Sequence, residues 1–78
     1  MTENEYLIML DPSNKKTAND MRSIMSAYPD NRPIFDNVIA IYSEDDFQKV
    51  ARDMLTLLHG REFLINEVGG NIFGQGNF

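Results

Sequence analysis

Three short apolar runs alternate with two amphipathic stretches along this chain, and this alternation limits the folds that it can adopt. The runs lie at about residues 5–10, 37–42 and 62–68. Each is too short for a typical helix and long enough for a strand. Residues 6–10 and 38–42 are apolar without interruption, which favours strands that other elements cover on both faces.

The first amphipathic stretch predicts a helix at about residues 15–28. Either Ser13 or Asn14 can cap the start of this helix, and Pro29 ends it. The apolar residues recur at helical spacing: Ala18, Met21, Ile24, Met25 and Tyr28.

The second stretch carries the clearest local signal and predicts a helix at about residues 44–59. Ser43 precedes Glu44, Asp45 and Asp46, which is a capping-box pattern with three acids at the positive end of a helix. Gly60 provides the C-terminal stop. The apolar stripe consists of Phe47, Val50, Ala51, Met54, Leu57 and Leu58.

The segment between the first helix and the second long strand predicts a weaker element. Residues 30–33 form a predicted turn and residues 34–35 a brief strand at a sheet edge, the position that Pro33 tolerates. These elements most simply form one sheet with both helices on one face, an α+β fold of the ferredoxin-like split β-α-β type. The predicted core is Leu7, Ile8, Met21, Ile24, Ile39, Ile41, Phe47, Val50, Met54, Leu57, Phe63 and Ile65.

The size of the chain predicts one domain, residues 1–78, near the lower limit for a self-sufficient core. The chain has no cysteine, so it forms neither a disulfide nor a cysteine-based zinc site, and we expect a cytoplasmic protein. No apolar run approaches the roughly 20 residues that span a membrane, so we expect no membrane partner. Marginal size makes oligomerisation the expected further source of stability.

The charge balance bears on partners. Seven Lys and Arg against twelve Asp and Glu give a net charge of -5. Proteins that bind nucleic acid usually cluster positive charge on one face, whereas here only Lys15 and Lys16 are adjacent. Nucleic-acid binding by the monomer is therefore disfavoured.

Residues 69–78 form a glycine-rich tail that follows the last predicted strand. The tail carries three large apolar side chains, Ile72, Phe73 and Phe78. We expect these three residues to form an interface, either as a strand exchanged at a dimer edge or by docking on a protein partner. An unstructured end is the alternative.

Three other features have both a chemical and a plain structural interpretation. Asp11, at the end of the first strand, is either a metal ligand paired with its dimer mate or a turn-forming residue before Pro12. His59 is either a general acid or base or a residue favoured at a helix C-terminus. The acids at 44–46 are either metal ligands or helix caps. In each case the structural interpretation is preferred.

Asp11 at the end of the first strand and the segment Glu62-Phe-Leu-Ile-Asn-Glu-Val-Gly-Gly-Asn71 resemble the SinR-like proteins. These are small ferredoxin-fold proteins related to the CRISPR adaptation nuclease and to ferredoxin-like antitoxin ribonucleases. The resemblance implies the fold and a dimer in which the end of one chain completes the partner's sheet. The short second strand and the acidic charge depart from the pattern of these proteins. The one candidate catalytic position that the resemblance implies is Asp11.

Together these features favour a small acidic, non-catalytic interaction or regulatory module without a cofactor. It would act as a homodimer or dock on a protein partner, as an accessory protein, an antitoxin or a phage-type inhibitor. The alternative is a metal-dependent endonuclease that uses Asp11 paired across a dimer and requires Mg²⁺. A small-molecule sensor domain is a third class, for which no pocket residue stands out.

Overall fold

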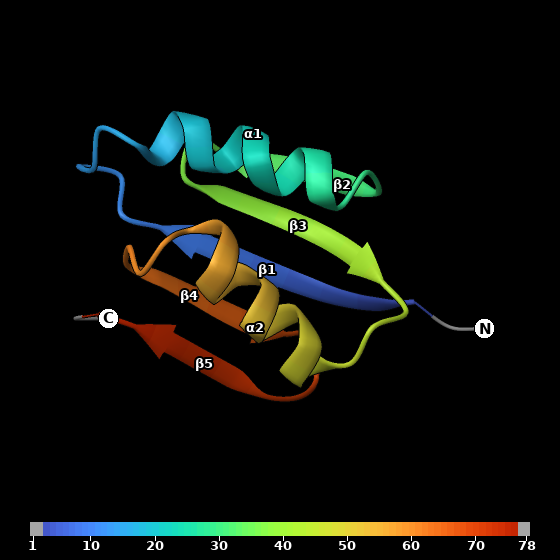
Figure 1. Cartoon of the computed structure of the whole chain (residues 1–78). Helices are drawn as coiled ribbons and strands as arrows, with labels where there is room; N and C mark the ends of the chain where they lie inside the picture. Colours follow the sequence, from blue (N-terminus) through green and yellow to red (C-terminus); the bar gives the residue numbers. More distant parts are fainter. Residues whose placement is uncertain (1–2, 77–78) are drawn as a thin grey trace.

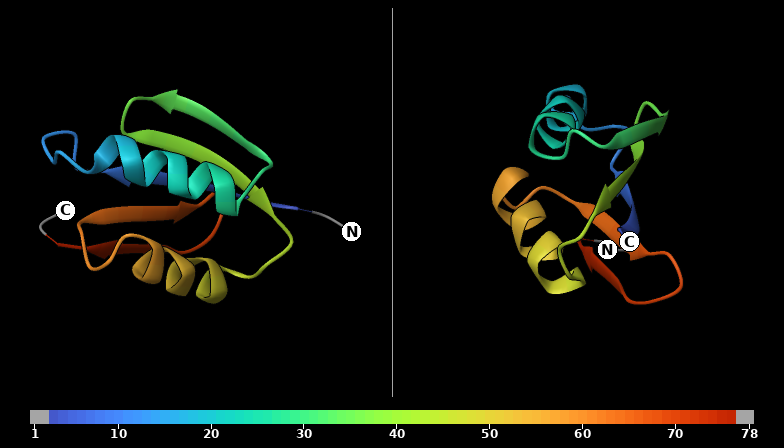
Figure 2. Two further views of the ribbon diagram at one scale, coloured as in Figure 1. Left: turned by 45° about the horizontal axis from the view of Figure 1, so that its top comes forward. Right: turned by 90° about the vertical axis from the view of Figure 1, so that its right-hand side faces the viewer.

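The computed structural model describes residues 3–76, which form one sheet covered by two helices (Figure 1). All neighbouring strands are antiparallel, in the order β2-β3-β1-β4-β5. Both helices lie on the same face of the sheet (Figure 2). In chain order the elements are β1 (Asn4–Leu10), α1 (Thr17–Ala27), β2 (Asn31–Phe35), β3 (Val38–Ser43), α2 (Phe47–Leu57), β4 (Phe63–Glu67) and β5 (Ile72–Gln75).

The fold class is therefore confirmed as α+β, with one five-stranded antiparallel sheet and two helices, and it is consistent with a ferredoxin-like fold. The three long strands and both helices lie within a few residues of their predicted positions. Two segments differ. The predicted turn at 30–33 is largely strand, because the backbone N–H of Tyr42 donates to the carbonyl of Asp30 at 3.0 Å and pairing with β3 begins there. The predicted tail contains β5, which pairs with β4 of its own chain.

Both predicted helix caps are wrong, for local reasons. Asn14 Oδ1 accepts from the backbone N–H of Lys16 at 2.8 Å, so its side chain closes a turn ahead of α1 instead of capping it. Ser43 still belongs to β3, and its Oγ accepts from the N–H of Asp45. The cap of α2 is Asp46, whose Oδ1 accepts from the N–H of Lys49 at 2.9 Å.

The core lies between the sheet and the helices. Nine of the twelve predicted core residues are buried, whereas Leu7, Phe47 and Leu57 are only partly buried. Leu7 points to the opposite face of the sheet from its neighbours Tyr6 and Ile8, which are fully buried. Five further core side chains are Tyr6, Leu10, Tyr28, Ala51 and Leu58. Of these, Tyr28, Ala51 and Leu58 belong to the predicted apolar stripes of the helices, whereas Tyr6 and Leu10 were placed only in the first strand.

A buried ion pair joins α1 to the start of β4. The carboxylate of Asp20 is 5% exposed and accepts two hydrogen bonds from Arg61, at 2.7 Å from Nε and 2.5 Å from Nη2. This two-pronged geometry is the strong form of a charge-assisted contact. Within residues 3–76, no buried side-chain nitrogen or oxygen lacks a hydrogen-bond partner.

Candidate interaction surface

The face of the sheet away from the helices is apolar at its centre. Along β1, the side chains of Tyr6, Ile8 and Leu10 point toward the helices, so those of Leu7 and Met9 point the other way. Tyr6, Ile8 and Leu10 are at most 2% exposed, whereas Met9 is 40% exposed. The alternation of strand side chains thus divides one apolar run between a covered face and an uncovered one.

Strand register extends this uncovered surface across the sheet. Met9 lies opposite Val38 of β3 on one side and Leu64 of β4 on the other, which makes a row of three large apolar side chains. Leu7 lies opposite Ala40 in the next row. Residues directly opposite each other in antiparallel strands share a face. We call this surface the open face; its apolar residues are Leu7, Met9, Val38, Ala40, Tyr42, Leu64 and Ile72. Met9 and Ile72 are exposed and four others are partly buried, whereas Ala40 is fully buried among its neighbours.

No other element among residues 3–76 covers the open face. The right-hand view of Figure 2 shows both helices on one side of the sheet and none on the other. The prediction that β1 is covered on both faces is therefore wrong for the single chain, since two helices of eleven residues each cover only one face. A strand with one solvated face normally alternates apolar and polar residues, and β1 and β3 do not.

The predicted interface residues of the tail separate onto different surfaces. Ile72 lies opposite Asn66 and is 61% exposed, at the margin of the open face. Phe73 turns to the helix side, where its ring lies 5.9 Å from that of Phe63, centroid to centroid. Phe78 lies outside the described residues. The role of all three in a dimer stays a prediction.

Asp11 follows β1 directly and closes a turn. Its Oδ1 accepts from the backbone N–H of Ser13 at 2.9 Å and from the Ser13 hydroxyl at 2.7 Å. These two hydrogen bonds hold the pKa of the Asp11 carboxyl below its ordinary value. This is the geometry of a turn-forming aspartate. A catalytic or metal-binding role for Asp11 stays a prediction.

His59 and the three acids show no arrangement typical of catalysis. His59 is exposed just after α2, with a positive φ of 51° beside Gly60 at 80°. Asp46 caps α2, and Asp45 pairs with Lys49. Among residues 3–76, no three His, Asp or Glu side chains gather closely enough to hold a metal ion.

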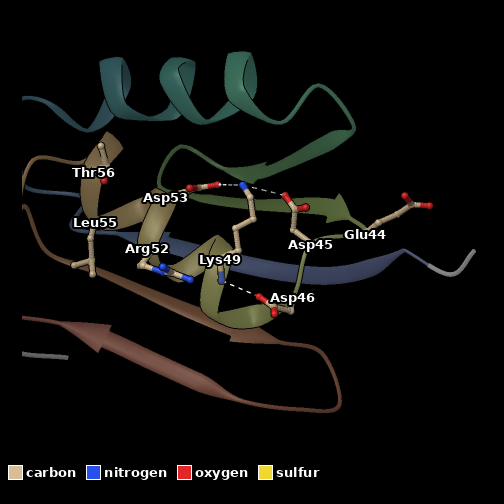
Figure 3. A pocket seen from close by; sticks show the side chains of 8 residues that line it. All are labelled: Glu44, Asp45, Asp46, Lys49, Arg52, Asp53, Leu55 and Thr56. Carbon is tan, nitrogen blue, oxygen red and sulfur yellow. Dashed lines mark hydrogen bonds and ion pairs between the residues drawn. The ribbon is translucent and has the colours of Figure 1, made fainter.

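A hollow at the N-terminal end of α2 is charged on most of its lining (Figure 3). The ammonium group of Lys49 lies between Asp45 and Asp53, at 3.5 Å and 3.0 Å from their carboxylates. Both pairs are substantially exposed, so they contribute little to stability. The lining residues are Glu44, Asp45, Asp46, Lys49, Arg52, Asp53, Leu55 and Thr56.

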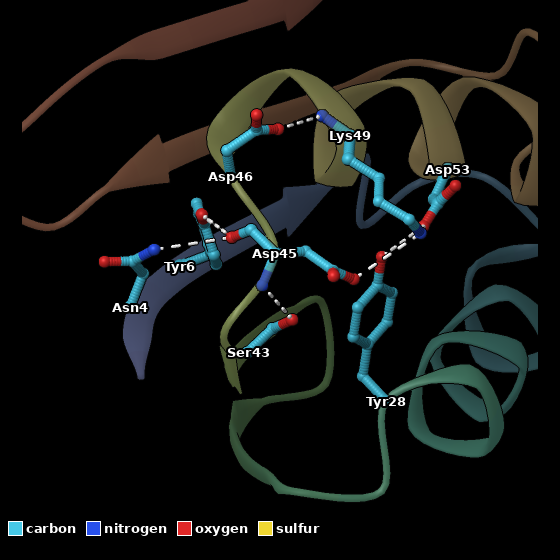
Figure 4. A network of polar contacts seen from close by, with 8 residues as sticks. All are labelled: Asn4, Tyr6, Tyr28, Ser43, Asp45, Asp46, Lys49 and Asp53. Atoms are coloured by element: carbon cyan, nitrogen blue, oxygen red, sulfur yellow. Dashed lines mark hydrogen bonds and ion pairs between the residues drawn. The ribbon is translucent and has the colours of Figure 1, made fainter. Parts of the chain in front are cut away.

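Asp45, Asp46, Lys49 and Asp53 of this lining also belong to a polar network that joins the two helices and β1 (Figure 4). The Tyr28 hydroxyl donates to Asp53 Oδ2 at 2.6 Å, and the Tyr6 hydroxyl donates to the carbonyl of Asp45 at 2.6 Å. Burial, and then the hydrogen bond to Asp53, raises the pKa of the Tyr28 phenol. Burial opposes ionisation of Asp53, but hydrogen bonds from Tyr28 and Lys49 outweigh it and lower the pKa of Asp53. The hollow is thus better explained as structural support than as a reactive site.

The chain matches no family model, no curated protein and no solved structure. The resemblance to the SinR-like proteins therefore stays a prediction. Among residues 3–76, neither helix has the length and apolar character required to cross a membrane.

Apart from Ile72, sequence reasoning missed the residues that form the open face. The sequence places Leu7 in the core and favours core filling over a binding surface for Met9, as for the other internal methionines, and it gives Val38 and Leu64 no specific role. For Met9 this interpretation is wrong, because the side chain is 40% exposed. The signal was nevertheless present, because uninterrupted apolar runs place large side chains on both faces of a strand. Among residues 3–76, no third helix and no second sheet covers the second face.

Proposed function

We propose that this chain is a non-catalytic interaction module that acts as a cytoplasmic homodimer, with the open face as its dimer contact. One observation carries the proposal: β1 and β3 bear large apolar side chains on both faces, and the helices cover only one. Stable domains bury such a face against a second layer. A second copy supplies a layer of the same apolar character, as a twofold contact requires.

The energetics favour such a contact. Complete burial of a side chain such as Met9, Val38 or Leu64 is worth about 1.5–3 kcal/mol, less the part that is already buried. By strand register, Glu5 and Arg32 are the charged strand residues on this face, and they have opposite signs. The three acids at 44–46 lie instead around the start of α2. The net charge of -5 is therefore not concentrated at the proposed contact.

The strand order supports a finer proposal about the fold. The order β2-β3-β1-β4 places β3 between β1 and β2, which α1 connects, as in a split β-α-β arrangement, and β5 adds one strand outside β4. We propose that the chain has this ferredoxin-like topology.

The test of the dimer is the replacement of Met9, the most exposed side chain of the central row, by a charged residue. We expect the wild-type chain to sediment as a dimer and Met9→Glu as a folded monomer, because the substitution would place two charges in an apolar contact. Ser23→Glu is the matched control, since Ser23 is exposed on α1. A wild-type chain that stays monomeric at high concentration, or a Met9→Glu variant that stays dimeric, would exclude the proposal.

The dimer could also be held by a second contact, in which the two copies exchange their C-terminal tails. If residues 69–78 pair with the partner's sheet, deletion of residues 70–78 gives a monomer although the open-face residues of β1, β3 and β4 are retained. A truncated chain that remains dimeric shows that those residues are sufficient. The two parts of the contact are therefore separable by measuring mass in solution.

The metal-dependent endonuclease remains the alternative proposal. It requires Asp11 to bind Mg²⁺ although Oδ1 already accepts two hydrogen bonds in its own turn. We expect no cleavage of RNA or DNA by the purified chain with Mg²⁺. Cleavage that disappears in Asp11→Asn would favour the nuclease instead.

A further inference from the structure

The two edges of the sheet differ in how well they are protected against a further strand. The β2 edge has three protective features: Pro33, which lacks an N–H, the charged Arg32, and a register irregularity between Pro33 and Phe35. Each of these hinders edge-to-edge pairing. The β5 edge, Ile72–Gln75, has no proline, no charge and no such irregularity.

The backbone of β5 also presents free hydrogen-bonding groups in a defined pattern. The N–H of Glu67 donates to the carbonyl of Asn71 at 2.8 Å across the hairpin. Because inward and outward groups alternate along an antiparallel strand, Phe73 and Gln75 bond to β4 while Ile72 and Gly74 direct their N–H and C=O groups outward. Among residues 3–76, no strand pairs with β5 on that side.

An apolar groove lies beside this edge on the helix side of the sheet. It has a volume of about 300 Å³ and runs between α2 and β5. A strand added beside β5 would direct alternate side chains to the helix side, toward the groove that Phe73 lines. The groove is lined by Phe47, Gln48, Ala51, Arg52, Leu55 and Phe73.

Arg52 indicates the charge of the occupant. Lys49, one turn earlier on α2, is paired with Asp45 and Asp53. Arg52 lines both the charged hollow and the groove and helps to lower the pKa of Asp53, but it forms no ion pair within residues 3–76. Its guanidinium is thus available to a carboxylate at the groove. The strand of a second copy, Ile72–Gln75, contains no acidic residue and would leave Arg52 unmatched.

We propose that the β5 edge and this groove bind an extended acidic peptide of another protein as a sixth strand. The peptide bonds to the outward backbone groups of Ile72 and Gly74 and places a large apolar side chain in the groove. A carboxylate two residues away, on the same face of the peptide strand, pairs with Arg52. This surface shares only Ile72 with the open face, through its backbone groups, so each copy in a dimer retains its own peptide site.

The test uses one synthetic probe, fluorescein-labelled Thr-Val-Phe-Val-Glu-Val-Thr with blocked ends, in which Phe and Glu share a face. Its affinity is measured by fluorescence polarisation. We expect saturable binding to the wild-type chain and about tenfold weaker binding to Arg52→Glu. The same probe with Lys in place of Glu should reverse this order and bind Arg52→Glu better. Arg22→Glu, on the exposed face of α1, is the matched control and should bind like the wild type.

A second variant tests the backbone contact. Gly74→Pro removes one outward N–H and leaves the bonds of Phe73 and Gln75 to β4 in place, so we expect it to weaken the probe about tenfold or more. In amide NMR spectra, the probe should shift the signals of Ile72 and Gly74 more than those of β2. If Gly74→Pro does not fold, the proposal is tested by Arg52→Glu alone, through its weaker binding of the Glu probe and its stronger binding of the Lys probe.

Two outcomes would overturn the proposal. One is no saturable binding of the probe up to about 1 mM, or binding that Arg52→Glu and Gly74→Pro leave unchanged. The other is a wild-type mass in solution that Gly74→Pro reduces, since a second copy would then occupy the edge. Neither result depends on Met9→Glu, so this proposal and the open-face dimer can fail independently.

Discussion

The two faces of the sheet carry similar side chains in different surroundings. On the covered face, Ile8 is packed between the helices and the neighbouring strands and is fully buried. On the open face, Met9, the next residue of the same strand, is 40% exposed. The difference teaches that hydrophobicity alone does not assign a strand residue to the core. The covering layer decides, and the part of the chain that the structure describes has one covering layer for two apolar faces.

The largest expected effect compares neighbours on opposite faces. Ile8→Ala should lower the free energy of unfolding by about 2–5 kcal/mol, because it leaves a cavity under the helices. Met9→Ala should cost less than about 1 kcal/mol when the protein is dilute enough to be monomeric. Chemical denaturation of both variants measures the difference. Equal losses would mean that the open face is covered even in the monomer.

A smaller effect compares a buried with an exposed ion pair on the helix side. Asp20→Asn weakens two short hydrogen bonds from Arg61 and should cost about 1–3 kcal/mol. Lys49→Gln removes the exposed pairs with Asp45 and Asp53 and should change stability by less than about 1 kcal/mol. Thermal unfolding of the two variants side by side tests the order, and the reverse order would contradict it.

The smallest effect is a pH dependence from Asp53. Its pKa in the folded chain is lower than its ordinary value of 3.8, so the folded state favours the ionised form. The resulting stabilisation is present above about pH 4 and is lost as the pH falls through the folded pKa. Asp53→Asn should therefore lose less stability than the wild type between neutral pH and pH 3, as followed by melting temperature. Tyr28→Phe, which removes one donor to Asp53, should flatten the profile in the same direction.

Periodicity accounts for most of the fold that could be predicted. The apolar stripe of α2 and the run of β1 are decided by residues two to four positions apart, so both were found to within a few residues. The start of β2 could not be found in this way, because Asn31 and Arg32 resemble turn residues until β3 pairs with them. The cap of α2 was misplaced because Ser43 and Asp46 are both good caps, and the length of β3 decides between them.

The candidate surfaces were predictable in part. The large apolar side chains of the glycine-rich tail predicted an interface there, and two of them, Ile72 and Phe73, do lie in the edge strand β5. The groove beside them depends on Phe47, Arg52 and Leu55 of α2, which are about twenty residues away in sequence. No local pattern relates α2 to β5, since their proximity arises only when β4 brings the tail back along the sheet.

The sequence by itself determined which segments are strands and helices, that they form an α+β sheet, and that both faces of β1 are apolar. These properties follow from local spacing and side-chain chemistry. Only the tertiary structure decided which face the helices cover, which edge is left without protection, and that Arg52 has no ion-pair partner among residues 3–76. These properties depend on contacts between residues far apart in the chain, and strand register and the packing of the two helices set those contacts.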